Sequence, residues 1–174
     1  DLAMTPDIDK GVLRLTVATD GAAPGDEVVA VAFDGDTRIV GAVGVPGAPF
    51  EIPIENAKLW SPGSPFLYNL TVSLTRANKT LDEVKSYFGM RKIAVVKDEN
   101  GVNRLFLNNQ VLFQLGPLDQ GWWPDGLYTA PSDEALRYDV EATRAMGFNM
   151  ARKHVKIEPL RWYYHCDQLG LLVW

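Results

Sequence analysis

The stretch "SDEALRYDVEATRAMGFNMARKHV" (132–155) has the pattern of a helix that runs directly into a strand. Ser132 can cap the helix because its hydroxyl accepts a bond from a free backbone N–H of the first turn. Leu136 and Val140 are spaced to lie on one apolar face. Gly147 fits the left-handed conformation just past a helix end. We therefore predict an amphipathic helix followed by a buried strand.

The same helix-to-strand pattern occurs again toward the C-terminus. A second helix is expected over 158–170, where a proline stands near its start and a glycine at its end, and "LLVW" (171–174) follows as a strand. "QVLFQLG" (110–116) and "FNMARKHV" (148–155) supply the earlier strands. The order strand, helix, strand, helix, strand predicts a parallel sheet. Three parallel strands alone are poorly covered, so we expect this segment to be the first part of something larger.

The residues before about 95 follow a different period. "VLRLTV" (12–17) and "LYNLTVSL" (67–74) alternate apolar and polar side chains, whereas "EVVAVAF" (27–33) is a more continuous apolar run, as expected of a strand covered on both sides. Turn dipeptides separate such runs: Asp20-Gly21, Pro24-Gly25, Asp34-Gly35, Pro46-Gly47 and Pro62-Gly63. This pattern predicts an antiparallel β-sandwich of about seven strands.

Composition and charge restrict the possible partners. Apolar residues make up 47% of the 174 residues and charged residues 22%, as in an ordinary globular protein. The formal net charge is −5 with no basic stripe, which argues against a nucleic-acid partner. No apolar run reaches the length of about 18 residues needed to span a membrane. A single cysteine, Cys166, cannot form an internal disulfide.

Five motifs occur in an order that is typical of a known family. They are W-S-P-x-x-P-x-L-Y (Trp60, Ser61, Pro62, Pro65, Leu67 and Tyr68) followed by Asp82, "YFGMRKI" with Gly89 and Arg91, "LFLNNQVLFQLG", "GFNMARKH" and "CDQLGLLVW". This succession, from about residue 8 to 174, resembles glycoside hydrolase family 2. That family groups β-galactosidases, β-glucuronidases and β-mannosidases.

The resemblance implies a fold and a domain division. Residues 1–94 would form an immunoglobulin-like β-sandwich, and residues 95–174 the first βαβαβ of a (β/α)₈ TIM barrel. A full barrel needs about 250 residues, so the barrel would be truncated here. A sugar-binding jelly-roll domain would precede Asp1.

The resemblance also implies a retaining hydrolase that acts on a β-linked sugar at a non-reducing end. Its two catalytic glutamates would lie on later barrel strands, the first in an Asn-Glu pair. No Asn-Glu dipeptide follows residue 103, so we expect no catalytic residue in this chain and no turnover by it alone. Glu134, Glu141 and Glu158 are expected to be solvated or first-turn helix charges. No cofactor or metal is expected, and His165-Cys166-Asp167 is interpreted as part of a structural helix rather than as a metal site.

Two segments supply candidate substrate contacts. In a barrel the loops after the strands form the active face, and the loop over 116–128 follows the first strand. Within it Trp122 and Trp123 could stack on a pyranose, and Asp119 or Asp125 could accept hydroxyl hydrogen bonds. Either tryptophan could instead pack beneath the loop.

The second segment is "ARKHV" (151–155). Arg152 matches the arginine of the family's N-x-x-R segment, where it would lie near the substrate. His154 is a further candidate, although it stands two residues beyond the arginine where the family pattern places a histidine three beyond. Lys153 and Lys156 are expected at the solvated surface.

An alternative hypothesis is a non-catalytic carbohydrate-binding or structural sandwich module. The expected partner in either case is a carbohydrate, with no nucleic acid and no membrane. The open sheet edge at the C-terminus predicts self-association or a homo-oligomer through residues 103–174. The family's bacterial members are often periplasmic or secreted, and we carry this over as the expected compartment, which the sequence itself leaves unknown.

Overall fold

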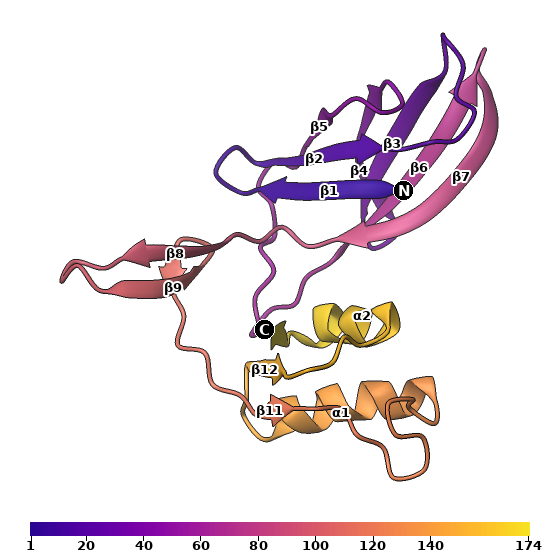
Figure 1. The fold of residues 1–174 in the computed structure, drawn as a ribbon. Helices are drawn as coiled ribbons and strands as arrows, with labels where there is room; N and C mark the ends of the chain where they lie inside the picture. Colours follow the sequence, from indigo (N-terminus) through magenta and orange to yellow (C-terminus); the bar gives the residue numbers. More distant parts are fainter. The chain divides into compact units, whose positions relative to one another are not determined.

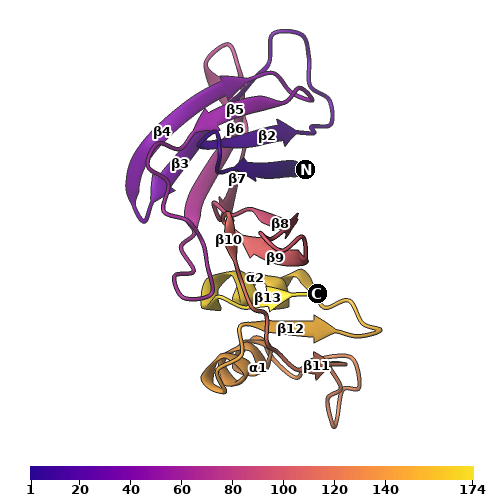
Figure 2. The ribbon, with the colours of Figure 1, turned by 90° about the vertical axis from the view of Figure 1, so that its left-hand side faces the viewer.

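The computed structural model describes all residues from Asp1 to Trp174 (Figures 1 and 2). Its contacts divide the chain into two compact units. The first contains Asp1–Leu59 and Phe66–Lys92, and the second contains Trp60–Pro65 and Ile93–Trp174. The short segment Trp60–Pro65 therefore belongs with the C-terminal half, although it lies in the N-terminal half of the sequence.

The first unit consists of two antiparallel sheets. One has the order β1-β2-β5 and the other β4-β3-β6-β7. Their strands are β1 (Leu2–Asp7), β2 (Val12–Val17), β3 (Glu27–Asp34), β4 (Thr37–Gly44), β5 (Phe50–Pro53), β6 (Tyr68–Arg76) and β7 (Lys79–Phe88). The predicted β-sandwich is confirmed, with the side chains of both sheets sharing one hydrophobic core.

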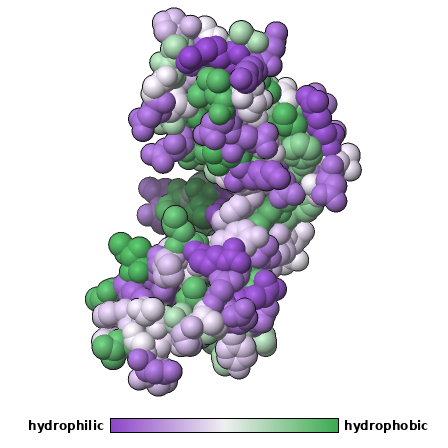
Figure 3. Space-filling view, turned by 90° about the vertical axis from the view of Figure 1, so that its right-hand side faces the viewer, coloured by the Kyte–Doolittle hydropathy of each residue, from purple (hydrophilic) through white to green (hydrophobic).

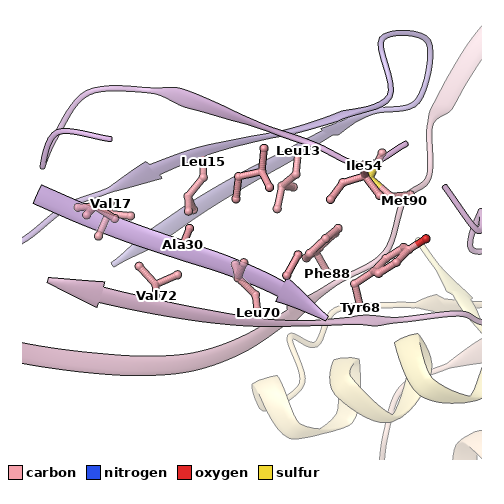
Figure 4. Packing of buried hydrophobic residues seen from close by; sticks show 13 residues of the cluster. Leu13, Leu15, Val17, Ala30, Ile54, Tyr68, Leu70, Val72, Phe88 and Met90 are labelled. Carbon is pink, nitrogen blue, oxygen red and sulfur yellow. The ribbon is translucent and has the colours of Figure 1, made fainter. Parts of the chain in front are cut away.

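Strand alternation builds that core. Leu13 and Leu15 of β2 are buried, and they face Leu70 and Val72 of β6 across the core (Figure 4). Tyr68 at the start of β6 stacks on Phe88 with ring centroids 5.1 Å apart. Each buried aliphatic side chain contributes on the order of 1.5–3 kcal/mol, so this cluster supplies most of the stabilisation of the unit.

The prediction that the run 27–33 is covered on both sides is wrong. Val28 and Ala30 of β3 are buried, whereas Val29 and Val31 are half-buried. The strand lies within an antiparallel sheet whose partner sheet covers one face, so its two faces differ in burial although both carry apolar residues.

One charged group is buried where β3 begins. The Asp26 carboxylate accepts hydrogen bonds from Arg76 Nε at 2.6 Å and Nη2 at 2.9 Å, and from the Ala23 backbone N–H at 2.8 Å. The hydrogen bonds from Arg76, and then that from Ala23, lower the pKa of Asp26 to about 2. This clamp ties the start of β3 to the end of β6.

The second unit combines an antiparallel ribbon with a parallel sheet. The ribbon has the order β10-β9-β8 and the parallel sheet the order β11-β12-β13. Its elements are β8 (Ile93–Lys97), β9 (Asn103–Leu107), β10 (Gln110–Val111), β11 (Leu118–Asp119), α1 (Asp133–Ala145), β12 (Met150–Lys153), α2 (Leu160–Leu169) and β13 (Leu172–Val173). The predicted order of parallel strands and connecting helices is confirmed.

The first parallel strand lies further along the chain than predicted. Gln110 and Val111 pair with β9, and regular parallel pairing begins only at Leu118. The preceding residues already run beside β12, because the Leu115 carbonyl accepts the Met150 N–H at 3.4 Å. Pro117 has no N–H to donate and so interrupts the regular ladder before β11.

Both helices begin and end near the capping residues that the sequence predicts. The Ser132 hydroxyl accepts the Ala135 N–H at 3.2 Å, and Gly147 after α1 has a φ of 87°. Pro159 is the N-cap of α2 rather than its first helical residue, and Gly170 follows the helix with a φ of 80°. Neither helix is long and apolar enough to cross a membrane.

The segment Trp60–Pro65 is held against these helices. Ser61 and Ser64 exchange two backbone hydrogen bonds of 3.0 Å, which closes the segment into a tight turn. The Trp60 indole N–H donates to the Asp167 carbonyl at 2.7 Å, and Arg144 Nη2 donates to the Pro62 carbonyl at 2.7 Å. The tryptophan-serine-proline motif thus contacts the ends of both α1 and α2.

Candidate functional site

The two faces of the parallel sheet have different surroundings. Ala151 of β12 and Val173 of β13 are a register pair, and both pack with the apolar side chains of α1 and α2. Asp119 and Lys153 are also a register pair, and alternation along β12 places them on the same helix-covered face. Arg152 and its partner Leu118 therefore lie on the opposite face, where both are exposed.

A buried ionic cluster lies on the helix-covered face at the carboxyl ends of β11 and β12. Lys153 Nζ is 2.6 Å from Asp119 Oδ2 and 2.6 Å from Glu158 Oε1, and Lys156 Nζ is 3.1 Å from the same Glu158 oxygen. The side chains of Lys153, Glu158 and Lys156 are 3%, 3% and 6% exposed. The expectation of solvated positions for these three residues is wrong. They form a compact charge cluster in which every buried charge has a partner.

The surroundings of Lys153 favour its charged form. Burial lowers the pKa of this ammonium, but the hydrogen bonds and negative charges of Asp119 and Glu158 outweigh burial and raise it overall. The ammonium also lies 4.5 Å from the ring centroid of Trp162. Lys153 therefore stays charged at neutral pH and pairs with two acidic side chains.

The cluster influences one further carboxyl group. Burial, and then the negative charge of Asp119, raises the pKa of Asp139 on α1. A carboxyl group with a raised pKa titrates nearer to neutrality than an exposed one.

The loop after β11 separates its two tryptophans. Trp123 exchanges backbone hydrogen bonds of 2.8 and 3.0 Å with Leu127 and packs against the core between helices and sheet. Trp122 is 57% exposed. Its ring centroid lies 4.4 Å from that of Tyr128, at an interplanar angle of 32°. Trp122 is therefore available to a ligand, whereas Trp123 anchors the loop.

The polar candidates gather at the ends of β11 and β12. Asp119 Oδ1 accepts the Gly121 N–H at 2.7 Å, and the Asp119 carbonyl accepts the His154 N–H at 2.9 Å. The His154 Nδ1 lies 3.1 Å from the Gln120 amide nitrogen. Asp119 and His154 are thus brought together by neighbouring loops, while Arg152 stands on the other face of the sheet.

Several residues of this site are missing from the sequence-based set. Lys156, Glu158 and Gln120 carry no local pattern that distinguishes them from surface residues. Tyr128 did have a signal. Asp125-Gly126 is a turn dipeptide flanked by apolar and aromatic residues, which is typical of a tight hairpin with paired side chains.

The helix α2 carries the histidine-cysteine-aspartate run. His165 is buried and its Nε2 lies 2.9 Å from Asp133 Oδ1. The hydrogen bonds of Arg161, and then of His165, lower the pKa of Asp133. Cys166 is buried in the core, and burial raises the pKa of its thiol, which keeps it unreactive.

Comparison with known proteins identifies the family. The family description "Glycosyl hydrolases family 2" matches residues 1–91, which is more than half of the chain. The chain belongs to glycosyl hydrolase family 2. Two curated relatives illustrate the similarity. A putative β-glucuronidase of Formosa agariphila is 29% identical over 179 residues, covering 97% of this chain and 16% of the relative. A β-galactosidase of Lactococcus lactis subsp. lactis is 31% identical over 128 residues, covering 73% of this chain and 12% of the relative.

Solved structures show the same fold. The β-glucuronidase of Ruminococcus gnavus matches 99% of this family 2 chain, and 28% of its own length, with a TM-score of 0.85 at 19% identity. The FMN-binding β-glucuronidase of Facaelibacterium prausnitzii L2-6 matches 99% of the chain, and 27% of its own length, with a TM-score of 0.79 at 23% identity. The chain thus spans less than a third of the length of each of these relatives.

Proposed function

We propose that this chain is part of a retaining glycoside hydrolase that cleaves β-glycosidic bonds in carbohydrates. The observation that carries the proposal is the collection of polar and aromatic side chains at the carboxyl ends of parallel strands in a member of family 2. In (β/α)₈ enzymes that end of the strands carries the active site. The glucuronidase and galactosidase relatives support a carbohydrate substrate.

The proposal includes a domain assignment. Residues 1–94 form an immunoglobulin-like sandwich, and residues 95–174 form the first βαβαβ of a (β/α)₈ barrel. This assignment is supported by the parallel sheet, which has both helices on one face. In a (β/α)₈ barrel the helices cover the outer face of the strands, and the opposite face lines the barrel interior. Arg152 and Leu118 would then point into the barrel.

The proposed substrate contacts follow from these faces. Arg152 reaches the substrate from the barrel interior. Trp122 and His154 contribute from the loops after β11 and β12. Asp119 contributes a carboxylate that is 26% exposed and keeps acceptor sites beyond its bonds to Lys153 and Gly121. Trp123 supports the loop from below.

The chain by itself should not turn over substrate. Retaining glycosidases need two carboxyl groups about 5–5.5 Å apart. A general acid alone contributes about 10²–10⁴-fold to the rate. The proposal places both carboxyl groups on later barrel strands.

Hydrolysis of chromogenic substrates tests this proposal. The 174-residue chain and a longer polypeptide continuing past Trp174 in the same gene would be assayed with aryl β-glucuronide, β-galactoside and β-mannoside. We expect no turnover by the former and turnover of at least one glycoside by the latter. Turnover by the 174-residue chain, or none by the longer polypeptide, would refute the proposal.

A further inference from the structure

We propose that Trp122 and Tyr128 form a preformed stacking platform for one pyranose ring, and that Lys156 and Glu158 are its positioning residues. The inference rests on the proposed function for the choice of a sugar as the ligand. It adds the ligand-binding surface, its orientation, and the residues that hold it in shape.

A small hairpin sets the orientation of the platform. Trp123 and Leu127 form an antiparallel bridge across the Asp125-Gly126 turn. The neighbouring residues Trp122 and Tyr128 contact each other through their rings and are 57% and 48% exposed, whereas Trp123 packs against the core. Trp123 thus anchors the hairpin, and Trp122 and Tyr128 lie at its surface.

The turn itself requires glycine. A Cβ at Gly126 would lie 2.0 Å from the Thr129 carbonyl oxygen. Leu127 has a φ of 54°, which is uncommon for a residue other than glycine. The loop therefore holds a strained conformation, and strain of this kind persists where the surroundings fix it.

The surroundings fix it through Lys156. The Lys156 ammonium lies 5.4 Å from the Tyr128 ring centroid and donates to the Gly121 carbonyl at 2.7 Å. Glu158 Oε1 holds the same ammonium at 3.1 Å. Tyr128 thus has Trp122 and Lys156 as neighbours, and Trp122 remains 57% exposed beside it.

This surface has the chemistry that recognises a sugar ring. The face of an indole is electron-rich and attracts the weakly positive C–H groups on the apolar face of a pyranose. A platform already held in place loses little conformational entropy when it binds. It should accept pyranoses that present an unbroken C–H face, such as β-gluco and β-galacto rings. It should reject acyclic polyols, which carry hydroxyls but have no such face.

The five tryptophans of the chain allow a direct measurement. With 5-fluorotryptophan incorporated, ¹⁹F NMR follows each indole separately, and Trp122→Phe assigns the Trp122 signal. Methyl β-D-glucopyranoside should move that signal saturably, with a Kd of about 1–10 mM, while sorbitol should not. Trp174 is the matched control, because it is also 57% exposed but its indole N–H is bound to Gln114 rather than backed by an aromatic ring.

Variants separate positioning from folding. Tyr128→Phe keeps the ring and should leave Kd within about twofold, whereas Tyr128→Leu should raise Kd about tenfold. Lys156→Met should also raise Kd, because Tyr128 loses its support, and the Trp123 and Trp162 signals report whether the unit is still folded. Tyr138→Leu, at an exposed position of α1, is the control for losing an aromatic side chain elsewhere in the unit, and it should leave Kd unchanged.

The outcomes distinguish this inference from the proposed function. Equal, non-saturable shifts of Trp122 and Trp174, or no shift of Trp122, would overturn the platform even if the longer polypeptide hydrolyses glycosides. Unchanged binding in folded Tyr128→Leu and Lys156→Met would overturn the positioning roles. Saturable binding at Trp122 alone, without hydrolysis by the longer polypeptide, would support the platform and refute only the catalytic proposal.

Discussion

The sandwich and the α/β unit bury different kinds of side chain. The sandwich has a continuous apolar core between two sheets, and its buried charge, Asp26, lies at the edge and is paired with an exposed arginine. The α/β unit buries two lysines and a glutamate beneath its loops, and it leaves apolar and charged side chains exposed on one face of its sheet. Hydrophobic side chains also reach the surface among hydrophilic ones in Figure 3.

This difference indicates that the two units use their buried side chains in different ways. A closed apolar core stabilises a fold without directing any group toward a ligand. Buried ion pairs add little net stability, since desolvation offsets most of their attraction, but they fix geometry. The α/β unit thus places buried ion pairs beneath the loops that follow β11 and β12, where the pairs fix the positions of those loops. Four predictions test this contrast, from the largest expected effect to the smallest.

Glu158→Gln should have the largest effect. It leaves the ammonium groups of Lys153 and Lys156 buried with one carboxylate fewer, which typically costs about 3–5 kcal/mol. Native-state hydrogen exchange of β12 and α2 amides would measure the loss. Glu141→Gln is the matched control, because Glu141 pairs with Arg137 at 2.7 Å on an exposed helix face, and it should cost under about 0.5 kcal/mol. Equal losses would mean that the buried cluster is no more important than a surface pair.

Leu15→Ala should weaken the sandwich by about 2–5 kcal/mol, because it opens a cavity in a core with no exposed surface at this position. Exchange of the β2 and β5 amides reports the change locally, which avoids assuming that both units unfold together. Leu81→Ala, at a position that is 47% exposed, should cost under about 1 kcal/mol. A similar loss at both positions would contradict the closed-core interpretation.

Asp26→Asn should change the response of the sandwich to acid. The pKa of Asp26 is about 2 in the folded chain and higher when unfolded, so the folded state releases this proton more readily. Its stabilisation is present above about pH 4 and is lost as the pH falls toward 2. In the variant this part of the acid sensitivity should disappear, as measured by the unfolding temperature between pH 2 and 6. An unchanged slope would show that the clamp does not contribute.

Ser132→Ala should have the smallest effect, a loss of about 1 kcal/mol from the start of α1, because the Ala135 N–H loses its capping oxygen. Exchange of the Ala135 amide measures it. Ser132→Asp also supplies a capping oxygen and should restore protection. Failure of Asp to restore protection would mean that the hydroxyl does not act as a cap.

Period and capping signals predicted most of the fold. Leu13, Leu15 and Leu70 fall on the core side because alternation is a local property of a strand. Ser132 and Gly147 mark the ends of α1 for the same local reason. The displaced first parallel strand depends on Pro117 and on which residues lie beside β12, and a window of sequence does not contain that information.

The candidate site was less accessible from sequence. Asp119 and Trp122 were proposed because loops after parallel strands carry function, and His154 was proposed from the family pattern beyond Arg152. The burial of Lys153 and Glu158 was not, because a charged residue in a loop is exposed by default and only the three-dimensional neighbours make pairing possible. A partly apolar outer face, as at Val29 and Val31, likewise cannot be distinguished from a covered one by its residue types.

The turn Trp60–Pro65 has a consequence for how family 2 proteins exchange parts. Its Trp60 side chain and Pro62 carbonyl form hydrogen bonds with α2 and α1, although residues 60–65 lie between strands of the sandwich in the sequence. A gene crossover near residue 94 would bring the Trp60–Pro65 turn of one parent together with the helices of another. Chimaeras made at that crossover should gain soluble yield when residues 60–65 are exchanged along with the helices. Functional recombinants should therefore be those in which this hexapeptide and the distant helix ends come from the same parent.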